Sequence, residues 1–167
     1  MAVKTAGVLH SNAIGIYVLN GANNYEAVAY STSGSLELSR ETIDATTKDN
    51  DGAKTIILGG EGWSMSCDGV GNYSALDQDG TANTDVQTTI DLFDARKNKT
   101  ELTLAWTTGE SDGSNADNMY TGNAFISSYS ESAGVNDVAT YSCSFESNGD
   151  ITKTAIVNGT DTFNELG

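Results

Sequence analysis

The stretch Trp63–Asp68, Trp-Ser-Met-Ser-Cys-Asp, alternates apolar and polar side chains without interruption. Successive side chains of a β-strand point to opposite faces, so this pattern predicts a strand with one buried and one solvated face. Trp63, Met65 and Cys67 form the predicted buried face. Such a strand is typical of a sheet that packs on one side, as in a β-sandwich or barrel.

The same alternation recurs along the chain. It is found in Leu36–Leu38, Leu102–Trp106, Phe125–Tyr129 and Ala139–Phe145. Ile14–Leu19 is apolar at most positions, which predicts a strand covered on both faces, and Asn20-Gly21 is a strong signal for a hairpin turn before Glu26–Tyr30. Many short strands of this kind predict an all-β fold, and the length of 167 residues predicts a single domain, 1–167.

One segment follows a helical period instead. Val86, Ile90 and Phe93 are spaced at i, i+4 and i+7, so they lie on one face of a helix. We therefore predict one helix at about Thr84–Lys97, which packs against the sheet through Val86, Ile90 and Phe93.

Both ends of this predicted helix carry the expected signals. Thr84 and Gln87 match a capping box, in which each side chain satisfies a free backbone N–H of the first turn. A helix dipole favours cations at the far end. Three of the chain's eight bases stand there: Arg96, Lys97 and Lys99.

The segment Arg40–Gly62, RETIDATTKDNDGAKTIILGGEG, is too long and too polar for a hairpin turn. Connections beyond ~12–15 residues are usually functional or disordered, so we predict a long loop here. Tyr73–Asn83 and Glu110–Asn118 are further polar loops. Residues at about 1–12 and 157–167 are predicted to form an N-terminal arm and a C-terminal tail.

The charge of the chain is strongly unbalanced, since 23 acids against 8 Lys and Arg give a net charge of −15. DNA binding depends on Lys and Arg that displace counterions from phosphates, so this balance argues against a DNA-binding role. An acidic surface suits a wall along which DNA slides without sticking. Charge alone favours the simpler reading, which is solubility.

The sequence gives no sign of secretion or of a membrane helix. Met1–His10 lacks an apolar signal core, and no stretch approaches the ~20 apolar residues of a membrane span. We therefore expect a cytosol-like compartment in which Cys67 and Cys143 stay reduced. Both cysteines stand at apolar positions of predicted strands, which favours buried packing over chemistry.

Two segments, Asp49–Gly52 and Asp77–Gly80, look like calcium loops at first sight. An EF-hand loop with Gly at its sixth position needs an acid at the first and Glu at the twelfth, and neither segment satisfies this. A single His and two separated Cys give no zinc set without carboxylates. The sequence therefore predicts turns here, without a metal or cofactor.

Catalytic patterns are equally weak. Nucleophilic catalysis needs a base beside the nucleophile, and the single His, His10, lies near the N-terminus. There is no Gly-x-Ser-x-Gly elbow and no phosphate-binding glycine motif after a predicted strand. Carboxylate pairs could serve glycoside hydrolysis, but 23 acids make any chosen pair uninformative. We predict a protein that is not an enzyme and that acts through its surfaces.

Three segments carry a family resemblance: Leu36–Asp49 (LELSRETIDATTKD), Gly59–Asp68 (GGEGWSMSCD) and Gly122–Asp150 (GNAFISSYSESAGVNDVATYSCSFESNGD). Their order, their spacing and motifs such as Ile-Asp-x-Thr-x-Lys-Asp resemble the major tail proteins of siphophages, the tail tube proteins typified by lactococcal phage tails. The third segment is the most specific. The chain departs from the family pattern in having no proline before its Asn-Asp pair.

The resemblance implies a structural subunit, with a β-sandwich and one flanking helix, whose sheets join into the inner barrel of a hexameric ring. Rings then stack into a tube through which DNA passes, and the loop at about 40–62 reaches the adjacent ring. The implied partners are further copies of the chain, the tape measure, the tail terminator and baseplate or tail-tip proteins. The implied location is the virion, after synthesis in the bacterial host cytoplasm.

Two sets of assembly residues follow from this resemblance. Acids expected on the solvent side of strands are candidates for the channel wall, with an outward-facing position as the alternative. These acids are Glu37, Glu101 and Glu146. The candidates for inter-ring contact in the long loop are Asp44, Thr46, Thr47, Lys48 and Asp49.

Two other classes of function stay open at this point. A tube protein of a contractile tail, a tailocin or a gene transfer agent would share the same design. A carbohydrate-binding or adhesin-like β-sandwich would need exposed aromatics clustered on one face. The available rings are Tyr25, Tyr30, Tyr73 and Tyr120.

Overall fold

The computed structural model describes residues 15–19, 25–28, 30–46, 53–72, 86–107 and 118–155. The elements in chain order are β1 (Gly15–Leu19), β2 (Tyr25–Val28), β3 (Ser31–Asp44), β4 (Ile56–Val70), β5 (Val86–Gln87), α1 (Thr89–Asn98), β6 (Leu102–Thr107), β7 (Asn118–Ser132) and β8 (Thr140–Ala155). The prediction of a mostly β chain with one helix is confirmed. The predicted N-terminal arm, the Asn20-Gly21 turn and the C-terminal tail lie outside the described residues.

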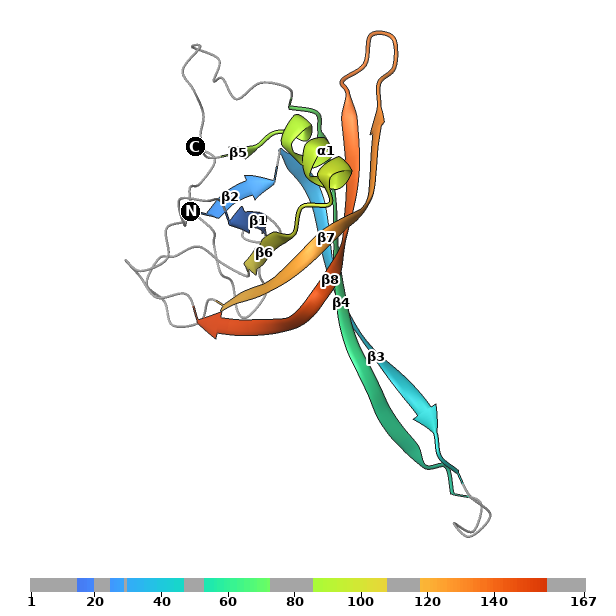
Figure 1. The fold of residues 1–167 in the computed structure, drawn as a ribbon. Helices are drawn as coiled ribbons and strands as arrows, with labels where there is room; N and C mark the ends of the chain where they lie inside the picture. The colour runs from blue at the N-terminus through green and yellow to red at the C-terminus, as the bar shows by residue number, and fades with distance from the viewer. Residues whose placement is uncertain are drawn as a thin grey trace, which may run out of the picture.

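The described strands form one eight-stranded sheet in the order β3-β4-β8-β7-β6-β1-β2-β5. Neighbouring strands are antiparallel except for the short pair β2–β5. The sheet curves until its halves approach, so that Gly34 of β3 lies against the side chains of Ile16 in β1 and Trp106 in β6 (Figure 1). The two layers of the predicted sandwich are therefore halves of one curved sheet, because strand twist and the bulges in β7 and β8 bend it.

The core fills the concave side of this sheet. The predicted buried face of β4 is confirmed, since Trp63, Met65 and Cys67 are at most 2% exposed. Met65 pairs with Phe145 of β8, which pairs in turn with Ile126 of β7, so one buried row crosses three strands. This core lies in the part of β4 that follows residue 62.

Trp63 is fitted into the core by two glycines. A Cβ on Gly122 would lie 2.5 Å from Cζ2 of the Trp63 ring, so only glycine allows the ring to approach β7 this closely. The indole Nε1 donates a hydrogen bond of 3.1 Å to the carbonyl oxygen of Gly149, whose φ of 108° favours glycine. The tryptophan thus ties β4 to both strands of the β7–β8 hairpin.

The helix is shifted relative to the prediction. It is capped by Thr88 and not by Thr84, because Thr88 Oγ1 accepts from the backbone N–H of Asp91 while the Asp91 carboxylate accepts from the N–H of Thr88. Gln87 and Val86 belong to β5, so the predicted box of Thr84 and Gln87 was wrong.

The predicted packing face of the helix was wrong for the same reason. Thr89 and Leu92 are the buried residues of α1, and Leu92 enters the core. Ile90 and Phe93 remain 50% exposed, although the Phe93 ring meets Tyr129 of β7 edge-on. Beginning the helix at Thr89 turns a different face toward the sheet.

The predicted loop 40–62 is also corrected. β3 continues to Asp44 and β4 begins at Ile56, so most of this segment is a long hairpin that projects from the body (Figure 1). A bulge between Arg40 and Thr42 interrupts its register. We call the projecting part, described for residues 39–46 and 53–61, the arm.

Candidate assembly surfaces

The convex side of the sheet, opposite the core, presents small polar and acidic side chains. Three cross-strand rows run over β3, β4, β8 and β7: Glu37–Ser64–Glu146–Phe125, Ser35–Ser66–Ser144–Ser128 and Ser33–Asp68–Ser142–Ser130. We call this surface the serine–acid face. No Lys or Arg stands in these rows, all of which are described, so the face offers no cation that would pair with a phosphate.

Hydrogen bonds within this face keep its central acid charged. Ser142 and then Ser33 hold the pKa of Asp68 below its ordinary value by donating to the carboxylate. The Ser33 hydroxyl lies 2.9 Å from Asp68 Oδ2, and the hydroxyls of Ser35 and Ser66 are 2.7 Å apart. The serines therefore bind one another and the acid across the strands.

The predicted channel acids divide into two groups. Glu37 and Glu146 lie in one row, separated only by Ser64. Glu101 precedes β6 and is not on a strand, contrary to the prediction, and its carboxylate accepts a 2.6 Å hydrogen bond from Asn148 Nδ2. Asp68 was missed, although it is the polar member that ends the Trp63–Asp68 alternation.

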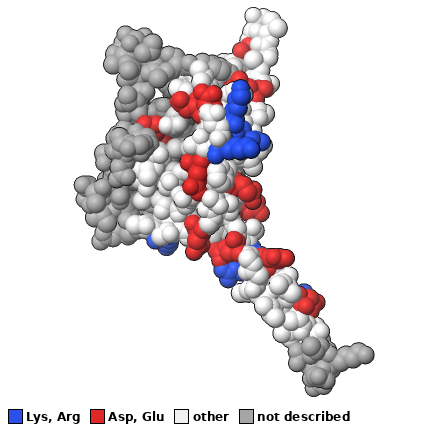
Figure 2. All heavy atoms as spheres, viewed as in Figure 1, with Lys and Arg blue, Asp and Glu red and all other residues white. Residues whose placement is uncertain are grey.

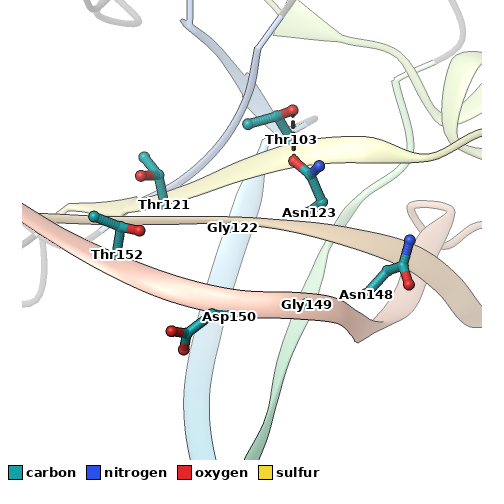
Figure 3. A pocket seen from close by; sticks show the side chains of 8 residues that line it. All are labelled: Thr103, Thr121, Gly122, Asn123, Asn148, Gly149, Asp150 and Thr152. Atoms are coloured by element: carbon teal, nitrogen blue, oxygen red, sulfur yellow. Dashed lines mark hydrogen bonds between the residues drawn. The ribbon is translucent and has the colours of Figure 1, made fainter.

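A shallow polar depression lies near Glu101, with a volume of about 410 Å³. It is lined by Thr103, Thr121, Gly122, Asn123, Asn148, Gly149, Asp150 and Thr152 (Figure 3). Thr103 Oγ1 and Asn123 Oδ1 are joined by a hydrogen bond of 3.0 Å. Asp150 is the single ionisable residue of the lining, so the depression has no acid–base pair for hydrolysis.

Other chemistry finds little support in the part of the chain that the structure describes. There, no group of three or more His, Cys, Asp or Glu could hold a metal ion, and no helix is long and apolar enough to cross a membrane. His10 and the two calcium-like segments lie outside the described residues. Of the four tyrosines considered for sugar binding, Tyr25 packs against Ala105 and Met119, and Tyr73 is not described.

The two cysteines are buried and unbridged, as predicted for packing residues. Cys67 of β4 stands directly opposite Cys143 of β8. A hydrogen bond between the thiols lowers the pKa of Cys67 and raises that of Cys143. Both sulfurs thus lie in the core, away from solvent.

The arm carries exposed aliphatic side chains on both of its faces. Ile43 pairs with Ile57 on one face, while Ile56 and Leu58 lie on the other. These four side chains are 50–58% exposed. Single exposed aliphatics are common, but four together on a narrow hairpin indicate a surface that a partner covers.

Hydrogen bonds order the end of the arm. Asp44 Oδ1 accepts from the backbone N–H of Thr46 at 2.9 Å, and Thr46 Oγ1 accepts from the N–H of Thr55 at 3.1 Å. Bonds from Thr46 lower the pKa of Asp44, which therefore stays ionised. Of the predicted inter-ring residues, the structure brings Asp44 and Thr46 together, while 47–49 lie outside the described residues.

A second hairpin projects at the other end of the molecule, where β7 turns into β8 (Figure 1). Val135 is 95% exposed and Val138 is 62% exposed at its tip. The subunit therefore offers apolar groups at both ends. Acidic groups are spread over the surface between them (Figure 2).

A family model of phage tail tube proteins matches residues 10–153, which is most of the chain. This chain belongs to the phage tail tube protein family. The resemblance to tail tube proteins drawn from the sequence is thus confirmed. No curated protein sequence matches the chain significantly.

Solved structures similar to this tail tube protein also come from tails and related assemblies. The tail of a gene transfer agent particle, refined with C6 symmetry, matches with a TM-score of 0.69 at 18% identity, over 89% of this chain and 100% of that one. The tail tube of phage SPP1 matches with a TM-score of 0.65 at 13% identity, over 90% of this chain and 81% of that one. The baseplate of the anti-feeding prophage matches with a TM-score of 0.60 at 10% identity, over 92% of this chain and 99% of that one. At these identities the likeness shows a shared fold.

Proposed function

We propose that this tail tube protein joins in hexameric rings that stack into the conduit for DNA ejection, with the serine–acid face lining the channel. The observation that carries this proposal is the face itself. Its rows over β3, β4, β8 and β7 lie opposite the core and consist of serines and acids, with Phe125 at one end and no Lys or Arg. Such a wall repels phosphates and lets DNA slide. Six copies carry a formal charge of about −90, from −15 each.

Ring closure is supported by the edge of the sheet. β3 spans 14 residues and pairs only with β4 among the described strands, so its other edge is unpaired. Long unpaired edges are templates for pairing with another chain, and a closed barrel removes them. We infer that neighbouring subunits join their sheets along β3 into an inner barrel. The sixfold symmetry of two of the similar assemblies favours six subunits.

Stacking is supported by the two projecting hairpins. The arm and the β7–β8 tip lie at opposite ends of the subunit, as a head-to-tail contact along a tube axis requires (Figure 1). The inter-ring set consists of the predicted Asp44, Thr46, Thr47, Lys48 and Asp49 together with the arm aliphatics. Burying the aliphatics on the next ring removes apolar surface from water.

Further partners belong to the same proposal. The tube surrounds a tape measure protein during growth and ends on a tail terminator and on baseplate or tail-tip proteins. The location is the virion, after synthesis in the bacterial host cytoplasm. DNA passes without sequence-specific binding, and the subunit has no enzymatic role.

Electron microscopy of the purified protein tests the assembly. Wild type is expected to form rings or hollow tubes, whereas deletion of residues 48–53 or the pair Ile43→Ser/Ile57→Ser leaves a folded subunit that forms no tubes. Ile57→Val, which keeps the apolar surface, is the matched control and assembles. Isolated small particles of the wild type, or normal tubes from the deletion, contradict the proposal.

A density map of the assembled tube tests the channel wall. Glu37, Asp68 and Glu146 are expected to face the bore, with Glu101 at its margin beside Asn148. A map that places all of these acids outside the channel would end this part of the proposal.

A tube protein of a contractile tail or gene transfer agent is the second candidate, and the similar structures include particles of such kinds. The neighbouring genes distinguish a contractile tail from a non-contractile one. A sheath gene beside this one indicates a contractile tail, and its absence from a complete tail gene cluster indicates a non-contractile tail.

A further inference from the structure

Helix α1 presents a half-exposed stripe that its own fold covers only in part. Ile90, Phe93 and Lys97 stand at i, i+3 and i+7, so they share one side of the helix. Ile90 and Phe93 are half exposed, while Thr89 and Leu92 on another side hold the helix in place. The stripe therefore keeps apolar surface exposed in the single subunit, although the Phe93 ring also meets Tyr129.

The C-terminal end of the same helix, together with its cap residue Lys99, holds the main concentration of positive charge in an acidic protein. Arg96, Lys97 and Lys99 fall within four residues of one another, and all three are exposed. Figure 2 shows the Lys and Arg spheres gathered over α1, on the face turned to the viewer. Among the described residues an ion pair joins Arg40 to Glu61 on the arm, and no ion pair there involves the three helix cations.

A ligand for this stripe needs both aliphatic and acidic groups, and the arm of the chain supplies them. Ile43 and Ile57 are exposed as a cross-strand pair, and Glu41 lies on their face of the hairpin, two residues before Ile43. Asp44 follows Ile43 on the opposite face, beside Ile56. Between Glu41 and Lys54 the sequence has four acids against two bases. The arm thus offers apolar groups to match the apolar stripe of the helix, and acids to match its cations.

The arm cannot reach the helix of its own subunit, because the two lie toward opposite ends of the molecule (Figure 1). A contact between them must join two copies, which is the arrangement that head-to-tail stacking provides. We propose that the exposed stripe of α1, with its cationic end, is the docking site for the arm of a subunit in the adjacent ring. The inference rests on the proposed stacking of rings and names its receptor.

The two parts of this contact have different roles. The aliphatics of the arm meet Ile90 and Phe93, which removes apolar surface from water and supplies affinity. Glu41 and Asp44 approach the helix cations, which selects the register and rejects wrong partners. A chain of net charge −15 repels its own copies, so the cations over α1 mark where another copy is tolerated.

Charge reversal tests the pairing. The helix variant Arg96→Glu/Lys97→Glu and the arm variant Glu41→Lys/Asp44→Lys are each expected to reduce the mass of tubes, measured by sedimentation and electron microscopy, by about tenfold. Single surface pairs are weak, but the contact repeats in every subunit of a ring. The combined four-site variant is expected to recover tubes to within about threefold of wild type, because the charges again match.

Controls separate this inference from the proposed function. Lys153→Glu makes the same kind of charge change on exposed β8 and is expected to leave tube mass unchanged. Thermal unfolding of each subunit checks that the fold is intact. If wild type forms tubes but the combined variant is no better than its parents, or if the helix variant assembles normally, the docking site is wrong while the tube function stands. If wild type forms no rings or tubes, the proposed function itself fails.

Discussion

The two ends of β4 show two uses of apolar residues in one strand. From Trp63 to Cys67 every second side chain is buried in the core. At Ile56, Ile57 and Leu58 three successive aliphatics are exposed on the arm. The first part stabilises the subunit, whereas the second gains stability only when another copy covers it. Experiments that separate folding from assembly should therefore divide this strand at about Gly62.

The largest difference in unfolding free energy between the core part and the arm part of β4 is expected when Trp63 is truncated. Trp63→Ala removes a ring that is 2% exposed together with its hydrogen bond to Gly149, and it should lower the free energy of unfolding by about 3–5 kcal/mol. Ile57→Ala, on the arm end of the same strand, should change it by less than about 0.5 kcal/mol. Urea unfolding of the separated subunit measures both values. Equal losses would erase the division of β4.

The glycines allow a smaller and more local version of the same comparison. Gly122→Ala places a methyl group 2.5 Å from the Trp63 ring and should cost about 1–3 kcal/mol of unfolding free energy. Gly60→Ala on the arm places its methyl group where nothing lies within 4 Å, and should be neutral to within about 0.5 kcal/mol. A crystal structure of the Gly122→Ala variant should show the indole displaced. A neutral Gly122→Ala would mean that the ring can move without loss.

Removal of the helix cap is expected to have the next smaller effect on the free energy of unfolding. Thr88→Ala removes the hydroxyl that accepts from the N–H of Asp91, and should cost about 1 kcal/mol in thermal or urea unfolding. Asp94→Ala, at an exposed position later in the helix, is the matched control. A cap at Thr84, as the sequence suggested, would instead make Thr84→Ala the damaging change.

How much the sequence could predict depends on whether one face of a segment is buried within the chain. The Trp63–Asp68 alternation located the core side and the solvated side of that strand, because one face of the strand is buried and the other is exposed to solvent. The arm gave no such pattern, since both of its faces are solvent-exposed in the isolated chain and RETIDATTKD looks like a polar loop. The run Ile56–Leu58 was the available signal, as three aliphatics in a polar loop need a partner.

The helix shows a second limit of the sequence. The sequence contains two possible capping boxes four residues apart, Thr84 with Gln87 and Thr88 with Asp91. The local pattern does not show which of them begins the helix. The choice was made by tertiary contacts, because Thr89 donates its hydroxyl to the carbonyl oxygen of Asn72 and Leu92 enters the core. Sequence reasoning therefore found the element but assigned the wrong face, and so missed that Ile90 and Phe93 are exposed.

The smallest expected effect is on the pH dependence of stability, and it distinguishes an acid of the body from an acid of the arm. The pKa of Asp68 on the body is lowered by Ser142 and Ser33, and that of Asp44 on the arm by Thr46. A carboxyl whose folded-state pKa is lowered adds stability above its ordinary pKa, and this stability is lost as the pH falls through the folded value. Because Asp68 is solvent-exposed, the contribution is small.

The double variant Ser33→Ala/Ser142→Ala should raise the pKa of Asp68, which NMR of its carboxyl carbon measures. It should also flatten the acid side of the stability–pH curve. Asp44 should titrate unchanged in the same variant, because its hydrogen bonds lie within the arm; a shift of both acids would mean that the two regions respond as one.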